Sequence, residues 1–175
     1  SWDIHWPGSW TKALHWASYA NRVQGYLYYH VRHWRYLGRQ TLGTDPLTSW
    51  DVTSDGNRCA LGIGAVIYDD ENGTPRPSLR LVSFREGTAD YDLLKMLEAQ
   101  IDRLDGYEAQ LPDDQQIMLR KARDFCKTPD WKGVVDDLVV WNEHDLARQV
   151  TELMNQGHVQ CLEWLELLQR IDTSK

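Results

Sequence analysis

The 175-residue chain is 42% apolar and 26% charged, a composition typical of a globular protein and outside the range of disordered chains. No stretch approaches the roughly 18 to 20 consecutive apolar residues that a membrane span requires, so we expect no membrane insertion. A net charge of −7 argues against a protein that binds nucleic acid by neutralising phosphates.

The N-terminus carries no export signal, because its first residues lack the basic, apolar and small-residue order of a signal peptide. The chain begins at Ser1 without an initiator Met. We therefore expect any targeting information upstream, where a signal would send the parent protein to the cell surface or beyond.

The first predicted elements are a helix and a strand. Residues 9–23 form a helical pattern with Ser9 as its N-cap, and Gln24-Gly25 interrupts it. The apolar face of this helix contains Ala13, Leu14, Trp16, Ala17, Ala20 and Val23. Residues 26–31 are apolar on both faces, which predicts a parallel strand covered on both sides.

A second strand follows a long loop. Residues 35–58 are rich in Gly, Asp and Ser and show no periodicity, which predicts an irregular connection. Residues 60–68 form a short apolar run that predicts a buried strand. Residues 69–77 contain Asn72-Gly73 and two prolines, which favour a turn-rich loop leading away from that strand.

The rest of the chain is predicted to be helical. Ser78 opens a helix that continues to Asp105-Gly106, and from Thr88 onward its apolar residues recur every three or four positions: Ala89, Leu93, Leu94, Leu97, Ile101 and Leu104. A second helix runs from Leu111 to about Cys126, with Pro112 near its first turn, and residues 134–141 also favour a helix. A last long helix begins near Asn142 or Asp145, and its apolar residues are Leu146, Val150, Leu153, Val159, Leu162, Leu165 and Leu168.

Two strands joined through a crossover and followed by helices predict an α/β architecture. A complete (β/α)8 barrel takes about 250 residues, so this chain would form only part of one. We expect residues 1–105 to supply strands and helices of a barrel, and residues 106–175 to form a helical segment that packs on it.

Cysteine and histidine residues indicate neither a disulfide framework nor a metal site. Cys59, Cys126 and Cys161 are far apart, and we expect buried thiols that act as small hydrophobes. His30 and His33 have an HxxH spacing, but at the end of a strand their rings would point to opposite faces. No cofactor motif is present. The other histidines are scattered and indicate no site: His5, His15, His144 and His158.

Aromatic residues gather near the N-terminus: six of nine Trp and five of eight Tyr lie in the first 50 residues. Flat rings with polar tips suit a cleft that binds a sugar, where a ring stacks on the C–H face of a pyranose. Ordinary core packing is the alternative for each single ring.

A specific resemblance covers about residues 10–105. Its elements are Gly25-Tyr-Leu-Tyr-Tyr29, Trp34, Asp45-Pro46, Ser78-Leu-Arg80 and Arg85-Glu-Gly-Thr-Ala-Asp-Tyr91. The segment resembles the C-terminal region, known as DUF4091, of glycoside hydrolase family 123 proteins. The resemblance implies the last strands of a (β/α)8 barrel that hydrolyses β-linked N-acetylgalactosaminides.

The implied mechanism is retaining and substrate-assisted, with the 2-acetamido oxygen as nucleophile and an adjacent Asp-Glu pair on the enzyme. In the family this pair precedes the matched region, so we expect it upstream of Ser1 and no catalytic residue in this chain. Asp70-Glu71 does not correspond to it, because this dipeptide lies in the predicted turn-rich loop.

The predicted site residues lie just after the C-terminal ends of the two predicted strands. In barrels the functional groups follow the C-terminal ends of strands, which predicts a sugar-binding wall with these side chains: Tyr29, His30, Arg32 and Trp34 after the first strand, and Tyr68 after the second. We expect a structural role for Arg80, Arg85, Glu86 and Asp90, with Asp90 near a helix N-terminus and paired with an arginine. The alternative is a functional role in which one arginine reaches the cleft.

The sequence is compatible with two functions. The first is a portion of a glycoside hydrolase that binds an N-acetylated glycan and is completed by the upstream polypeptide or by a partner chain. The second is a non-catalytic carbohydrate-binding or scaffolding module with the same aromatic residues. Neither requires a cofactor, a metal, nucleic acid or a membrane.

Overall fold

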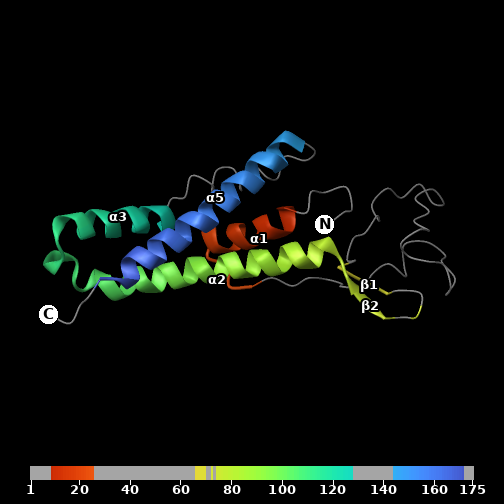
Figure 1. Ribbon diagram of the computed structural model, residues 1–175, viewed down its shortest axis with the longest axis horizontal. Coiled ribbons are helices and arrows are strands. Elements are labelled where there is room, and N and C mark those ends of the chain that lie inside the picture. The colour runs from red at the N-terminus through yellow and green to blue at the C-terminus, as the bar shows by residue number, and fades with distance from the viewer. Residues whose placement is uncertain (1–8, 26–65, 70–71, 73, 128–143, 172–175) are drawn as a thin grey trace.

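A computed structural model describes residues 9–25, 66–69, 72, 74–127 and 144–171. This part of the chain is predominantly helical and contains one pair of short strands (Figure 1). The predicted strand at 26–31, the loop at 35–58, most of the strand at 60–68 and the helix at 134–141 lie outside the described residues. In the described ranges, no helix combines the length and apolar character needed to cross a bilayer.

Helix α1 spans Ser9–Ala20 and ends before the predicted break at Gln24-Gly25. The cause is a Schellman motif: the Val23 N–H donates to the Ser18 carbonyl at 2.8 Å, and the Arg22 N–H donates to the Tyr19 carbonyl at 3.1 Å. Arg22 adopts the left-handed conformation that this motif needs, with φ of 56°. Its guanidinium pairs with Glu98 and lies 5.5 Å from the centre of the Tyr19 ring, which holds the turn against α2.

Strands β1 (Ile67–Asp69) and β2 (Pro75–Pro77) form an antiparallel hairpin. Tyr68 is opposite Arg76, and the prolines that flank Arg76 keep β2 short and exposed because they cannot donate to a ladder. Our prediction of a loop over residues 69–77 is therefore wrong at residue 69, which ends β1, and at residues 75–77. The antiparallel pairing places β2 beside β1 before α2 begins.

Helix α2 spans Leu79–Asp105 and is the longest element. As predicted, Ser78 caps it: its side-chain oxygen accepts the Leu81 N–H at 3.2 Å. The buried residues recur every three or four positions along one face: Gly87, Asp90, Leu94, Leu97, Ile101 and Leu104. The predicted apolar stripe is confirmed from Leu94 onward, and Asp90 occupies a core position in the same stripe.

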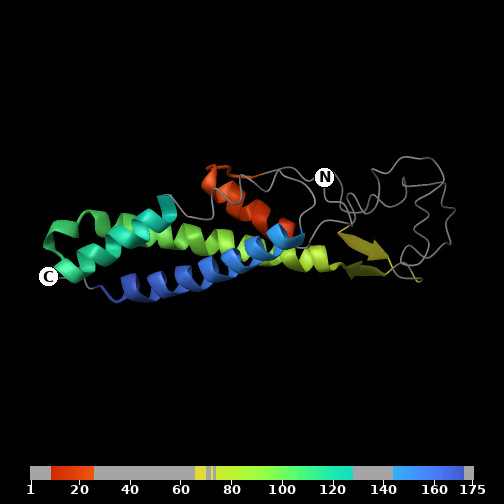
Figure 2. The same cartoon turned by 90° about the horizontal axis from the view of Figure 1, so that it is seen from above.

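The other helices surround α2. A short 3-10 helix, η2 (Glu108–Gln110), leads into α3 (Asp113–Lys127), which turns back along one end of α2. Helix α5 (His144–Gln169) runs beside α2 in the same direction, and the Arg103 guanidinium donates to the Leu168 carbonyl at 3.1 Å (Figure 2). Helix α1 lies across the middle of α2 and also contacts α5.

The buried face of α5 differs from the predicted one. Val150, Leu165 and Leu168 are buried as expected, but Val159 and Leu162 are 53% and 45% exposed. The buried positions instead follow helical spacing through smaller or more flexible residues: Met154, Gly157 and Cys161. A prediction based only on leucine and valine misses these residues, although they lie on the side of α5 that meets α1 and α2.

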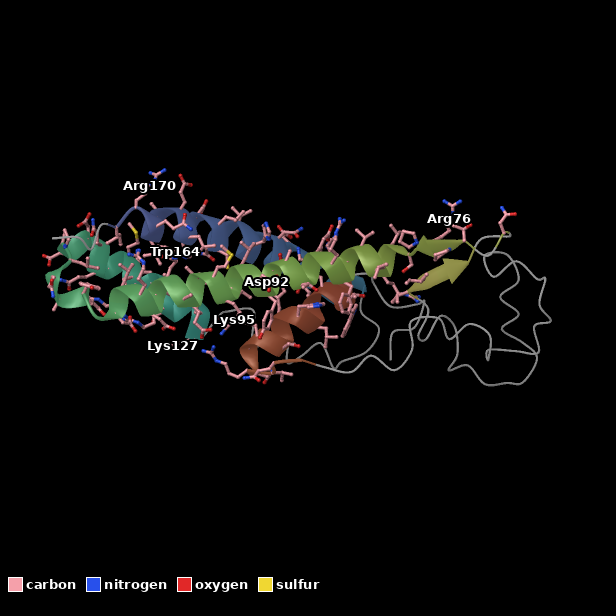
Figure 3. All side chains as sticks on the ribbon, turned by 90° about the horizontal axis from the view of Figure 1, so that it is seen from below. Arg76, Asp92, Lys95, Lys127, Trp164 and Arg170 are labelled. Carbon is pink, nitrogen blue, oxygen red and sulfur yellow. The ribbon has the colours of Figure 1, made fainter. Side chains whose placement is uncertain are left out.

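The described cysteines are structural. Cys126 and Cys161 are free and buried, as the sequence predicted, and Cys59 lies outside the described residues. Burial raises the pKa of the Cys161 thiol to about 12. Trp164 is partly buried and packs on the core from α5 (Figure 3).

Candidate functional site

The most unusual group in the described structure is the carboxylate of Asp90, which is only 2% exposed. It accepts three interactions from two other helices. The Trp16 indole donates to Oδ2 at 2.7 Å, the Lys12 ammonium lies 3.2 Å from Oδ2, and the His158 Nδ1 lies 2.7 Å from Oδ1. We call these four residues the Asp90 cluster. They join α1, α2 and α5 at one point.

Local sequence explains how α1 reaches this carboxylate. Lys12 and Trp16 are four residues apart, so they lie on one face of the helix. The Trp16 ring is fully buried, and it fits because the residue of α5 that faces it, Gly157, has no side chain. A Cβ on Gly157 would lie 2.5 Å from the Trp16 Cη2 atom, closer than real side chains approach.

A second close contact lies one turn earlier on α2. A Cβ on Gly87 would meet the His15 ring at 2.4 Å and the Lys12 Cα at 3.0 Å. His15 is buried with its Nδ1 3.0 Å from the Thr11 carbonyl, and its ring meets the Phe84 ring edge-on at 4.7 Å between centres. Glycine at position 87 therefore lets α1 approach the α2 backbone.

Burial of His15 makes stability depend on pH. Desolvation lowers the pKa of the imidazole below its ordinary value, against smaller opposing effects of the Thr11 carbonyl and the Asp90 charge. The unfolded chain then binds the proton more readily than the folded chain, so protonation favours unfolding. The free energy of unfolding that neutral His15 contributes is therefore fully present above pH of about 6.5, and it is lost as the pH falls to the lowered pKa. Urea unfolding should show a smaller loss of stability on acidification in His15→Gln than in the wild type. Equal pH slopes in the two proteins would contradict this assignment.

A groove of about 450 Å³ opens beside the Asp90 cluster. Lys12, Asp90 and His158 contribute to its wall, and four further residues from α2 and α5 complete the lining: Glu86, Ala89, Asn155 and Val159. The Lys12 ammonium also donates to the Asn155 Oδ1 at 3.3 Å. The groove thus combines charged, polar and apolar groups from three helices.

The predicted sugar-binding residues fall mostly outside the described part. Tyr29, His30, Arg32 and Trp34 lie in residues that the structure does not describe. Tyr68 lies in β1, pairing with β2 through its backbone. The proposed aromatic wall therefore stays a prediction.

The predicted polar group on α2 is described. Glu86 and Asp90 line the same groove, one helical turn apart as their spacing indicates, whereas Arg80 and Arg85 are not among its lining residues. Our expectation that Asp90 lies near a helix N-terminus is wrong, because α2 begins at Leu79 and Asp90 is near its middle. Its partners in the described structure are Lys12, Trp16 and His158 rather than an arginine, since α1 and α5 both meet α2 at this position.

His15 and His158 were not predicted to have a role, yet both contribute to the interfaces around α2. One signal was present in the sequence. Gly157 interrupts the pattern of the last helix beside His158, and a glycine inside a helix usually has a packing reason. Asp90 also falls in register with Leu94 and Leu97, which marks it as a buried polar residue.

Within the described ranges, no group of three or more His, Cys, Asp or Glu side chains is arranged to hold a metal ion. Comparisons of the chain with protein-family models, with curated proteins and with solved structures found no match.

Proposed function

We propose that this chain is the C-terminal part of a (β/α)8 glycoside hydrolase resembling family 123, and that residues 26–34 form an aromatic wall of its sugar site. The chain would supply Tyr29, Trp34 and Tyr68 for stacking, with Arg32 and His30 as hydrogen-bonding groups. N-acetylated glycans are the substrates that the resemblance implies.

The observation that carries the proposal concerns the motif Arg85-Glu-Gly-Thr-Ala-Asp-Tyr91, which together with Ser78-Leu-Arg80 forms the most specific part of the resemblance. Two of its residues have defined roles in the α1–α2 interface: Gly87 gives room to His15, and Asp90 binds Trp16. Helix α1 directly precedes the aromatic segment, and α2 follows the second predicted strand. The motif thus joins the two helices that flank the proposed wall in sequence.

In the parent protein, the catalytic groups and the sugar-binding groups would come from different parts of the polypeptide. The substrate's 2-acetamido group would attack the anomeric carbon, while an Asp-Glu pair upstream of Ser1 orients it and transfers the proton. This chain would hold the sugar and exclude water from one side of the cleft. We expect the 175-residue chain alone to hydrolyse no glycoside.

Replacement of Trp34 by alanine in the full-length parent tests the wall. We expect weaker binding of an N-acetyl-β-galactosaminide, by roughly threefold to tenfold, because stacking on an aromatic ring contributes about 0.5–1.5 kcal/mol. The melting temperature should stay unchanged. An unchanged Michaelis constant together with a large drop in melting temperature would instead assign Trp34 to the core.

The intact mass of the native protein separates the two functions that the sequence left open. A mass well above 20.4 kDa, together with an upstream Asp-Glu pair and hydrolysis of N-acetyl-β-galactosaminides, would support the hydrolase. A native mass equal to that of this chain, with sugar binding but no turnover, would favour the non-catalytic binding module.

A further inference from the structure

The groove between α1, α2 and α5 presents several polar groups, and contacts with Asp90 and Lys12 orient two of them, His158 and Asn155. Its volume of about 450 Å³ lies within the range of small-molecule sites, about 300–1,000 Å³. The described residues that line it include none of those proposed for the aromatic wall. A ligand bound here would therefore be held by different side chains from those of the proposed wall.

His158 supplies a hydrogen-bond acceptor. Its Nδ1 lies 2.7 Å from the Asp90 Oδ1, and because a carboxylate only accepts, Nδ1 must carry the hydrogen. In the neutral ring this leaves Nε2, on the side of the ring away from Asp90, without a hydrogen and able to accept. The side chain is 36% exposed and lines the groove, as a group that accepts from a ligand must.

Asn155 supplies a donor, and Glu86 supplies a second acceptor. The Lys12 ammonium donates to the Asn155 Oδ1. The two hydrogens of the amide Nδ2 are therefore available to a ligand. The exposed Glu86 carboxylate has no hydrogen bond or ion pair among the described residues. The groove thus combines two acceptors and one donor on its rim.

The unpaired charge of the lining and its apolar residues favour a hydroxylated ligand that is not an anion. The Lys12 ammonium is already paired with Asp90 at 3.2 Å, and the exposed Glu86 carboxylate opposes an anion but accepts hydrogen bonds from hydroxyls. Ala89 and Val159 are the apolar residues of the lining, on which C–H groups can pack. A pyranose presents such a C–H face together with hydroxyls that both donate and accept.

From this arrangement we propose that the groove is a binding site for a neutral hydroxylated molecule of monosaccharide size. Its hydroxyls donate to Glu86 and to the His158 Nε2 and accept from the Asn155 Nδ2, while its C–H face covers Ala89 and Val159. It uses none of the residues proposed for the aromatic wall.

Titration of the full 175-residue chain with D-galactose, and separately with N-acetyl-D-galactosamine, tests the site by NMR. We expect saturable shifts of the Ala89 and Val159 backbone amide signals, with a Kd on the order of 1 mM. Glu86→Ala and Asn155→Ala should each weaken this binding about tenfold or more, because each removes a hydrogen bond to the ligand. Both residues are exposed, so neither change should affect folding.

Matched controls come from exposed neighbours outside the groove. Asp92→Ala removes the same charge from α2 as Glu86→Ala does (Figure 3), and Gln156→Ala removes an amide from α5. Neither should change the affinity. Trp34→Ala should also leave the Ala89 and Val159 shifts unchanged, which distinguishes this site from the proposed wall.

Three results would overturn the proposal. The first is the absence of saturable shifts with either sugar. The second is saturable binding of ethanolamine in place of the sugars, which would show that the groove selects a cation. The third is loss of the shifts in Trp34→Ala, which would assign the sugar to the aromatic wall.

Discussion

Replacing Asp90 with alanine is expected to lower the free energy of unfolding by about 3–5 kcal/mol, the cost typical of breaking a buried charged network by removing one partner. The carboxylate is 2% exposed and binds the Trp16 indole, the Lys12 ammonium and the His158 ring. Without it the indole N–H is buried with no acceptor at this position, and the positive charge of Lys12, whose side chain is 12% exposed, loses its counter-charge.

Urea denaturation of the full chain measures this effect. Asp92→Ala provides the control: it removes the same charge and side chain from an exposed position two residues away, and should change stability by no more than about 0.5 kcal/mol. Asp90→Asn should fall between the two, since its amide oxygen still accepts from Trp16 but carries no charge to balance Lys12. Equal stability of Asp90→Ala and Asp92→Ala would show that the Asp90 cluster does not hold the three helices together.

Replacing Gly157 with alanine is expected to destabilise the protein by about 1–3 kcal/mol, the cost of forcing an extra group into a packed core. In an exposed helix interior the same change stabilises by about 1 kcal/mol, because alanine has the higher helix propensity. Here the new Cβ would lie 2.5 Å from Cη2 and 3.0 Å from Cζ3 of Trp16. The ring is fully buried and hydrogen-bonded to Asp90, so it cannot move aside without cost.

Thermal and urea unfolding of Gly157→Ala, beside Gly106→Ala, check the sign of the effect. Gly106 follows α2 with φ of −68°, a conformation open to any residue, and a Cβ there would meet nothing within 4 Å. We expect Gly106→Ala to be neutral or slightly stabilising. A gain of stability in Gly157→Ala would mean that α1 and α5 are not in the close contact described above.

Local signals in the sequence determined much of the helical structure. Ser78 caps α2 through its own side chain, and Pro112 precedes α3, so both starts were predicted from neighbouring residues. The spacing of Leu94, Leu97, Ile101 and Leu104 likewise predicted the buried face of α2. These features depend on residues within one or two helical turns, which is why one sequence suffices to find them.

The end of α1 was missed for a physical reason. Arg22 adopts a left-handed conformation that glycine usually occupies, and its pair with Glu98, 76 residues away, supports that conformation. The short strand β2 was missed because two prolines in three residues argue against a strand. Pairing with β1 decides that conformation.

Neighbouring residues alone predict the helix starts, the apolar stripe of α2 and the burial of two cysteines. The contacts of Asp90 with Lys12, Trp16 and His158 depend on tertiary packing, because the four residues come from three helices. The same packing gives Gly87 and Gly157 their roles, since a missing side chain matters only where another helix fills the space. A buried charge can be suspected from helical register, but its partners are chosen by the fold.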